Sequence, residues 1–222
     1  MKKQIVILSA LCALGIATAQ AAAAPEFTFA AGPTVAQIDG LGYHNKGVAG
    51  LSIAGAATWD RLTFDGALTR LGGGSDAACD RGGCITQSGP RWLDAGAGVS
   101  YAVPLTERLT VVPRIEIGRS GFMGSGAHTD YLAAGAAALY GLTPRLTLVA
   151  QLMHGRTDGV TSLPGGQYQS AGLGLVERHP LGLPGDVSLT YSRRRWFVDT
   201  LPFGGDQYMR ESALTLGYSR AF

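Results

Sequence analysis

The sequence has few charged side chains and few cysteines, and after its first segment it has no long apolar run. Charged residues make up 15% of the 222 residues, and only three residues are cysteine. Beyond residue 21, no stretch approaches the ~20 consecutive apolar residues that a membrane-spanning helix needs. This absence excludes a membrane protein built from helices. Glycine, in contrast, is abundant, with 33 residues, and the apolar residues are spread thinly and evenly.

A basic excess is also missing once the first segment is set aside. The whole chain has 18 lysine and arginine residues against 16 acidic ones, and Lys2 and Lys3 account for the difference. A dedicated nucleic-acid-binding protein should carry a positive excess. We therefore expect no nucleic-acid partner.

The first segment has the pattern of a secretory signal peptide. Lys2 and Lys3 precede an apolar stretch, residues 5–16, and small residues follow at 17–21 with two A-x-A-like sites. The apolar stretch is too short for a membrane helix. We expect residues 1–21 to direct Sec export and then to be removed, which leaves residues 22–222 as a single domain.

Two cysteines remain after cleavage, Cys79 and Cys84. In an oxidising compartment such a pair favours a local disulfide. A metal site is the weaker alternative, because two cysteines alone supply too few ligands. We expect no cofactor and no bound metal.

Alternation of period two runs through the mature sequence. In residues 109–117, Leu109, Val111, Ile115 and Ile117 share one face, while the other carries polar residues. Such segments are strands, and at ten or more residues they exceed the usual length in soluble proteins. They match the ~9–11 tilted residues that cross a bilayer. A soluble β-sandwich alternates in the same way, but here the polar face is unusually rich in small residues.

A repeated motif divides the chain into hairpins. It begins at residues 61–64, 108–111 and 145–148, with a weaker copy at 186–189, and each copy follows a turn signal. We expect four short turns on one side of the membrane and longer loops on the other. The predicted strands are residues 26–35, 47–59, 62–70, 91–103, 109–119, 130–141, 146–156, 168–178, 186–198 and 208–222. The fold class is therefore an all-β, closed antiparallel up-and-down transmembrane barrel of ten strands, with eight as the alternative.

The C-terminal residues resemble a known family. Leu214, Leu216, Tyr218 and Phe222 alternate toward a terminal phenylalanine. This resembles the last strand of bacterial outer-membrane barrels, which the barrel-assembly machinery recognises, although Arg220 departs from the usual residue third from the end. The chain as a whole looks like a small outer-membrane barrel of the OmpA, OmpX or opacity-protein type. The resemblance implies a Gram-negative outer membrane, with its lipids and lipopolysaccharide as partners, and says nothing about activity.

Charged residues fall on the inward face of several predicted strands. A simple register across the turn at 104–108 sets Arg114 opposite Gly98 and Glu116 opposite Gly96, so two large side chains face positions that have none. We expect an ion-pair network in the lumen, because small barrels are usually filled by side chains. A polar conduit or a buried acid-base site is the alternative. The predicted network consists of Asp65, Asp94, Arg114, Glu116, Arg194 and Glu211.

The segment after the last short turn carries three consecutive arginines. Arg193 and Arg195 should face outward near the extracellular rim, followed by Trp196. Arginine binds phosphate through paired hydrogen bonds, so these three residues are a candidate lipopolysaccharide contact. A solvated patch is the alternative.

No catalytic constellation emerges. His154 lies on an apolar face and Arg156 occupies the place where a His-x-Ser motif would need serine. We expect no enzyme, with an outer-membrane hydrolase acting on lipids or peptides as a remote alternative. The expected role is structural, surface-interacting or adhesin-like, with an unknown extracellular ligand. A narrow, porin-like passage for small solutes is the second hypothesis.

Overall fold

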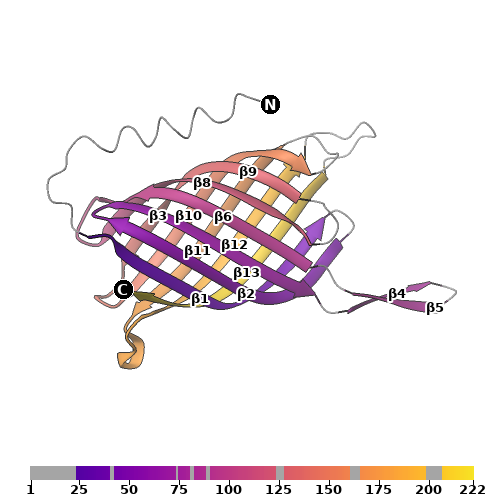
Figure 1. Cartoon of the computed structure of the whole chain (residues 1–222), viewed down its shortest axis with the longest axis horizontal. Helices are drawn as coiled ribbons and strands as arrows, with labels where there is room; N and C mark the ends of the chain where they lie inside the picture. Colours follow the sequence, from indigo (N-terminus) through magenta and orange to yellow (C-terminus); the bar gives the residue numbers. More distant parts are fainter. Residues whose placement is uncertain are drawn as a thin grey trace.

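The protein is a closed ring of antiparallel strands (Figure 1). The computed structural model describes residues 24–40, 43–73, 75–80, 83–88, 91–123, 128–160, 166–198 and 207–222. The expected export signal, residues 1–21, lies outside this range. The strands are β1 (Glu26–Gly40), β2 (Tyr43–Trp59), β3 (Leu62–Gly73), β4 (Ser75–Asp80), β5 (Gly83–Ser88), β6 (Arg91–Tyr101), β7 (Val103–Pro104), β8 (Leu109–Phe122), β9 (His128–Gly141), β10 (Leu146–Val160), β11 (Gln167–Arg178), β12 (Asp186–Val198) and β13 (Gln207–Ala221).

Ten of these strands make the barrel wall, as the alternation predicts. Each pairs with its neighbour along the chain, β6 pairs with β8, and β1 pairs with β13 to close the ring. β7 is a short continuation of the β6 edge beyond Ala102. β4 and β5 form a separate two-stranded sheet. The prediction of a ten-stranded barrel is confirmed, and the eight-stranded alternative is wrong.

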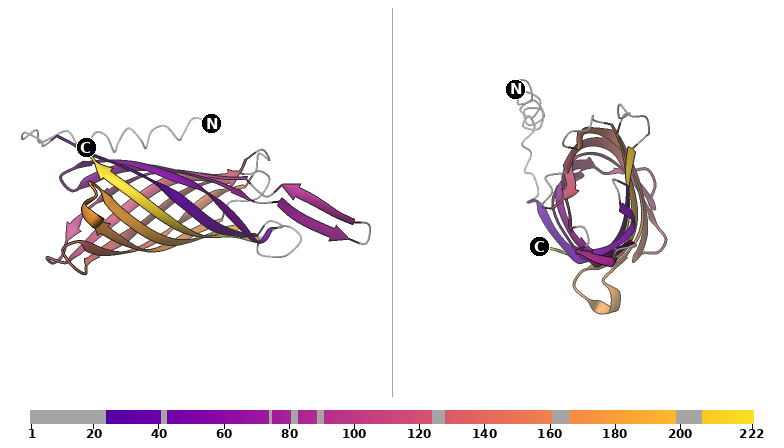
Figure 2. Two further views of the ribbon diagram at one scale, coloured as in Figure 1. Left: turned by 90° about the horizontal axis from the view of Figure 1, so that it is seen from below. Right: turned by 90° about the vertical axis from the view of Figure 1, so that its right-hand side faces the viewer.

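The two ends of the barrel differ. Four short connections and the C-terminus lie at one end, and the β4–β5 hairpin projects from the other (Figures 1 and 2). We call these the turn end and the loop end. A single 3-10 turn, η1 (Pro180–Gly182), lies in the longest connection at the turn end. In outer-membrane barrels, short turns face the periplasm and longer loops face outward, so we expect the loop end to be the extracellular one.

Two of the short turns share one chemistry. In residues 105–109 and 142–146 the sequence reads Leu-Thr-x-Arg-Leu. The Thr106 hydroxyl accepts a hydrogen bond from the Leu109 amide at 3.0 Å, and Thr143 does the same for Leu146 at 3.0 Å. A threonine side chain that replaces a backbone partner stabilises a tight turn. The repeated motif therefore marks turns as well as strands.

This turn geometry shifts one expected register. The first turn closes between Leu105 and Leu109, where the Leu105 amide donates to the Leu109 carbonyl at 2.8 Å. The expected pairing of Arg114 with Gly98 is therefore wrong by two residues, because it placed the turn one residue too early. Ser100 pairs with Arg114, and Gly98 pairs with Glu116.

The first expected loop is also shorter than its sequence suggests. β1 and β2 were predicted to end at residue 35 and to begin at residue 47. Both strands continue toward the loop end, and Gly40 still pairs with Tyr43. The two strands therefore extend further in the loop direction than the strand pattern indicates.

The outward face forms an apolar belt. Exposed apolar side chains alternate along every wall strand and include Phe29, Val35, Leu51, Ile115, Leu132, Leu152, Leu173, Leu189 and Leu214. Trp59, Tyr101, Tyr140 and Tyr218 are also exposed, and they lie toward the turn end. Such an aromatic girdle is typical of a membrane-water boundary. Among the described residues, no helix has the length and hydrophobicity of a membrane span.

The seam between the first and last strands reaches the C-terminal residue. The Phe222 amide donates to the Phe27 carbonyl at 2.8 Å, and the Phe27 amide donates to the Phe222 carbonyl at 3.4 Å. The Phe222 side chain is 75% exposed at the turn end, and the guanidinium carbon of Arg220 lies 5.3 Å from the centre of its ring.

Deleting Phe222 should therefore impair assembly, because it removes both seam hydrogen bonds and the terminal aromatic ring. Closed barrels resist detergent until heated, so assembly is measured as the fraction of protein with heat-modifiable gel mobility. Phe222→Tyr, which keeps the ring and the backbone, is the control and should assemble normally. Equal assembly of the deletion and the control would show that the terminal residue is dispensable.

Candidate functional site: the closed lumen and the outer rim

The inward face holds two groups of charged side chains. The first group lies on β3 and β8, where Arg114 forms a two-pronged ion pair with Asp65. In the second contact of this pair, Nη2 of Arg114 donates to Oδ2 of Asp65 at 2.7 Å. Nε of Arg114 donates to Glu116 at 3.0 Å. Arg114 and both carboxylates are at most about one fifth exposed. Of the four acids in the predicted network, the structure thus pairs Arg114 with two, Asp65 and Glu116.

Glycine makes room for this first group. A Cβ atom on Gly98 would lie 2.6 Å from Nη2 of Arg114, so a larger residue there would displace the guanidinium. A Cβ on Gly118 would similarly lie 2.4 Å from the Tyr131 ring. The Tyr131 hydroxyl donates to Glu116 at 2.7 Å. Although the register differs from expectation, large inward side chains do occupy the space above glycines.

The second group spans the barrel. Arg194 on β12 forms an ion pair with Asp94 on β6, and the Ser120 hydroxyl donates to the other Asp94 oxygen. β6 and β12 are five strands apart in a ring of ten, so this pair connects opposite walls. Glu211 on β13 is 4% exposed, and its Oε2 atom has no hydrogen-bond partner among the described residues.

Aromatic rings fill the same level. Tyr131 and Tyr168 stack at 4.4 Å, and Tyr168 contacts Trp196 edge-on at 6.0 Å. Trp196 contacts Trp92 at 6.0 Å, again from β12 to β6. All four side chains are at most 4% exposed. Trp196 was grouped with Arg193 and Arg195 as a candidate lipopolysaccharide contact, but its side chain is 3% exposed and lies on the inward face. It shares that face with Arg194, because residues two positions apart in a strand point to the same side.

The second group and the rings occlude the loop half of the lumen. Further side chains at most 5% exposed line the inward face there: Ile38, Val48, Leu71, Met153 and Met209. Side chains this buried leave no space for water beside them. Toward the turn end, inward residues such as Asp65 and Arg114 keep partial exposure. The lumen is therefore open to water from the turn end and closed toward the loop end.

Hydroxyl groups continue the polar layer along the wall. The Thr34 hydroxyl is 2.9 Å from that of Thr215 and 2.7 Å from that of Ser52, which is 2.8 Å from that of Thr69. This row connects β13, β1, β2 and β3. Thr69 is the register partner of Asp94, so the row leads to the ion pair that crosses the lumen.

The comparisons with solved structures agree with this architecture. The chain has the fold of a small outer-membrane β-barrel. Neisserial surface protein A is 12% identical to this chain over 88% of it and 97% of its own length, with a TM-score of 0.45. Ail, the attachment invasion locus protein of Yersinia pestis, is 14% identical over 89% of this chain and 99% of its own length, with a TM-score of 0.38. An outer-membrane channel from Pseudomonas putida is 12% identical over 92% of this chain and 99% of its own length, with a TM-score of 0.49. These likenesses concern the fold alone.

Sequence comparisons add no family. No protein-family model matches the chain, and no curated protein matches its sequence. Any role must therefore be argued from the geometry of this barrel.

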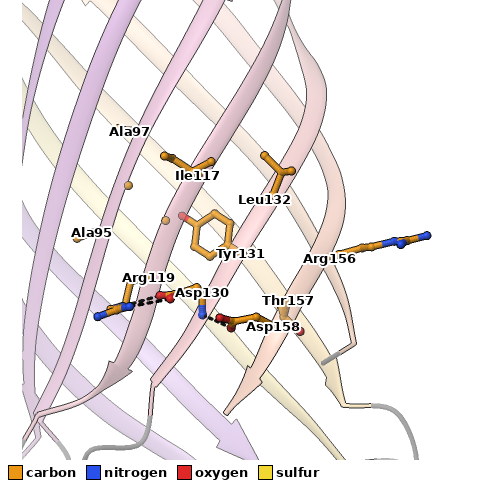
Figure 3. A pocket seen from close by; sticks show the side chains of 12 residues that line it. Ala95, Ala97, Ile117, Arg119, Asp130, Tyr131, Leu132, Arg156, Thr157 and Asp158 are labelled. Carbon is orange, nitrogen blue, oxygen red and sulfur yellow. Dashed lines mark hydrogen bonds and ion pairs between the residues drawn. The ribbon is translucent and has the colours of Figure 1, made fainter. Parts of the chain in front are cut away.

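The outer face carries its own polar residues near the loop end. A groove of about 760 Å³ crosses β6, β8, β9 and β10, and its lining includes Ala95, Ala97, Ile117 and Leu132 (Figure 3). At its loop-end margin, Arg119 pairs with Asp130, and the Asp130 amide donates to Asp158 at 2.9 Å. The Arg119 side chain is 60% exposed.

Residues that a hydrolase would need are not assembled among the described residues. His154 faces outward and is exposed, and no hydrogen bond connects it to a described serine or acid. No group of three or more histidine, cysteine or acidic residues within the described ranges is placed to hold a metal ion.

The strengths of the two arginine pairs on β8 should differ sharply. Arg114→Ala leaves two partly buried carboxylates without their cationic partner. Removing one partner of a buried pair typically lowers the free energy of unfolding by about 3–5 kcal/mol, and by less where water enters the lumen. Arg119→Ala is the matched control, because it breaks a two-pronged pair on the same strand that faces outward. Exposed pairs contribute little, so it should leave stability nearly unchanged.

The measurement is urea unfolding of the barrel refolded in lipid vesicles. The double change of Asp65 and Arg114 to alanine should cost less than the sum of the two single changes, because they belong to one contact. Equal stability of the Arg114 and Arg119 variants would contradict the lumen pairing.

Proposed function

We propose that this protein is a surface-interaction barrel of the outer membrane, adhesin-like in character, in which a closed wall displays the β4–β5 hairpin to the cell exterior. One observation carries the proposal. At the loop end of a barrel with a closed lumen, Ser75–Asp80 and Gly83–Ser88 form a separate sheet that extends beyond the wall (Figure 2).

The hairpin is suited to contact another chain. A two-stranded sheet has two edges, and each edge presents backbone N–H and C=O groups that a further strand can pair with. The hairpin belongs to a 17-residue connection, residues 74–90, between two wall strands. Contact through backbone groups would tolerate varied partner sequences, as expected of an attachment surface.

The two mature cysteines would stabilise this hairpin. Cys79 and Cys84 are register partners across the two strands. Cα atoms of directly opposed residues lie about 4.5–5.5 Å apart, which falls within the range that a disulfide spans. The disulfide stays a prediction, and it would limit the fraying of an isolated hairpin.

The alternative roles have less support. A pore needs an open lumen, whereas rings and ion pairs fill the loop half of this one. A hydrolase needs an activated nucleophile or a bound metal, and the described residues bring none together. Interaction at the surface needs neither an open lumen nor a catalytic group.

The route to the membrane is part of the same proposal. Residues 1–21 would direct Sec export, and the assembly machinery would recognise Leu214, Leu216, Tyr218 and Phe222 at the C-terminus. The first three of these face outward on β13, where a partner can reach them during insertion.

Replacing residues 75–88 with a short Gly-Ser linker should abolish attachment without preventing assembly. Bacteria that display the full chain are allowed to settle on a panel of immobilised extracellular-matrix proteins and on cultured epithelial cells, and adherent cells are counted. We expect attachment above that of cells without the protein, and loss of that gain in the linker variant.

The matched control is Cys79→Ser with Cys84→Ser, which keeps the hairpin and should retain part of the attachment. Heat-modifiable mobility shows that each variant is assembled. Attachment that is unchanged without the hairpin, or that never exceeds the background, would overturn the proposal.

A further inference from the structure

One connection at the turn end leaves the barrel wall sideways. Residues 179–185 join β11 to β12 and contain η1. Figure 1 and the right-hand view of Figure 2 both show this connection, drawn in orange, standing out from the ring of strands. The connection therefore reaches into the space in which a membrane would surround the barrel.

Hydrogen bonds within this connection hold its shape. The His179 amide donates to the Gly185 carbonyl at 3.1 Å and closes the base of the connection. The Leu183 amide donates to the Pro180 carbonyl at 3.0 Å. Pro180 and Pro184 also restrict the backbone, because the proline ring fixes φ. The sideways projection is thus a built feature of the turn end.

The tip of the connection presents leucine side chains to the outside. Leu181 is fully exposed, and Leu183 is 45% exposed. His179 and Leu181 have left-handed φ angles of 50° and 52°, a conformation that strains any residue with a Cβ and that glycine adopts freely. A strained backbone that displays an apolar side chain with no protein contact indicates a partner outside the barrel.

The base of the connection lies at the level of the aromatic girdle. Gly185 packs so closely against the end of β13 that a Cβ atom there would lie 2.7 Å from the Tyr218 hydroxyl and 2.2 Å from the Ser219 carbonyl. Tyr218 belongs to the girdle that marks the membrane-water boundary. A connection that starts at this boundary and points sideways carries its leucines to the level where lipid headgroups meet acyl chains.

Charge does not favour a charged partner at this connection. Arg178 and Asp186, which flank it, are register partners on neighbouring strands and carry opposite charges. Glu177 and His179 are the other ionisable residues beside them. The structure describes residues 166–198 without a gap, so every charge in this part of the chain is included. Apolar contact is therefore what the connection offers.

We propose that residues 179–185 are a lipid anchor, in which Leu181 and Leu183 insert among the acyl chains of phospholipids in the leaflet at the turn end. Apolar side chains at the headgroup boundary bind a membrane by removing their surface from water. The anchor continues the apolar belt of the wall beyond the strands. It lies at the opposite end from the β4–β5 hairpin, so it stands apart from the proposed attachment role.

The test is photo-crosslinking in intact cells that make the full chain. A benzophenone amino acid, which reacts with C–H bonds on illumination, replaces Leu181. We expect an adduct whose added mass is that of a phospholipid, because the tip would lie among acyl chains. Heat-modifiable mobility shows that the variant is assembled, and the same replacement of Leu183 provides a second position.

Two matched positions calibrate the result. Leu173, an outward residue of the belt that is 54% exposed, should give lipid adducts, whereas Glu107 in a short turn at the same end should give none. No lipid adduct at position 181, when position 173 gives one, would overturn the proposal. So would an adduct with a protein, which would assign the connection to a protein partner. An adduct with lipopolysaccharide would place the turn end in the other leaflet and would also overturn it.

Discussion

The contact on which this barrel most depends joins its opposite walls through the lumen. Arg194 on β12 reaches Asp94 on β6, and Trp196 meets Trp92 between the same two strands. A barrel of eight strands is narrow enough to be filled by ordinary side chains, whereas ten strands enclose more space. Arginine and tryptophan, the longest and the bulkiest side chains, are what such a space requires. The ring of strands is closed, but its interior is closed only because these residues meet.

The rest of the lumen follows from that requirement. An ion pair out of water is stable only when its remaining donors and acceptors are satisfied, and Asp94 receives a second hydrogen bond from Ser120. Where one wall supplies a large side chain, the neighbouring wall supplies glycine, as Gly98 does beneath Arg114 and Gly118 beneath Tyr131. The abundance of glycine in the sequence is thus partly explained by packing. The six charged residues of the predicted network comprise four acids and two arginines, and Glu211 retains an oxygen without a described partner.

The sequence is informative where structure is local. Strand alternation and the Leu-Thr-x-Arg-Leu turns depend on neighbouring residues, so the ten strands and the face of each inward charge could be predicted. The pairing of Arg194 with Asp94 could not, because the two residues are 100 positions apart and nothing in either strand specifies the other. The register of Arg114 was wrong by two residues, since it depended on which residue closes a turn. Trp196 was misplaced for a different reason: it was grouped with its arginine neighbours by sequence, although alternation sets it with Arg194.

The β4–β5 hairpin was also missed, because its glycine-rich sequence is typical of a flexible loop. The hairpin extends beyond the wall, outside the closed lumen. A filled interior makes the wall a rigid support for it.

The central claim, that side chains meeting across the barrel close it, is tested most directly by ion conductance in planar lipid bilayers. The wild-type chain is compared with a variant in which Arg194 and Trp196 are both alanine, after heat-modifiable mobility shows that each is assembled. The account predicts no discrete conductance steps for the wild-type barrel and clear steps for the variant, whose lumen has lost both contacts between β12 and β6. Steady conductance by the wild-type chain, or none by a fully assembled variant, would contradict it.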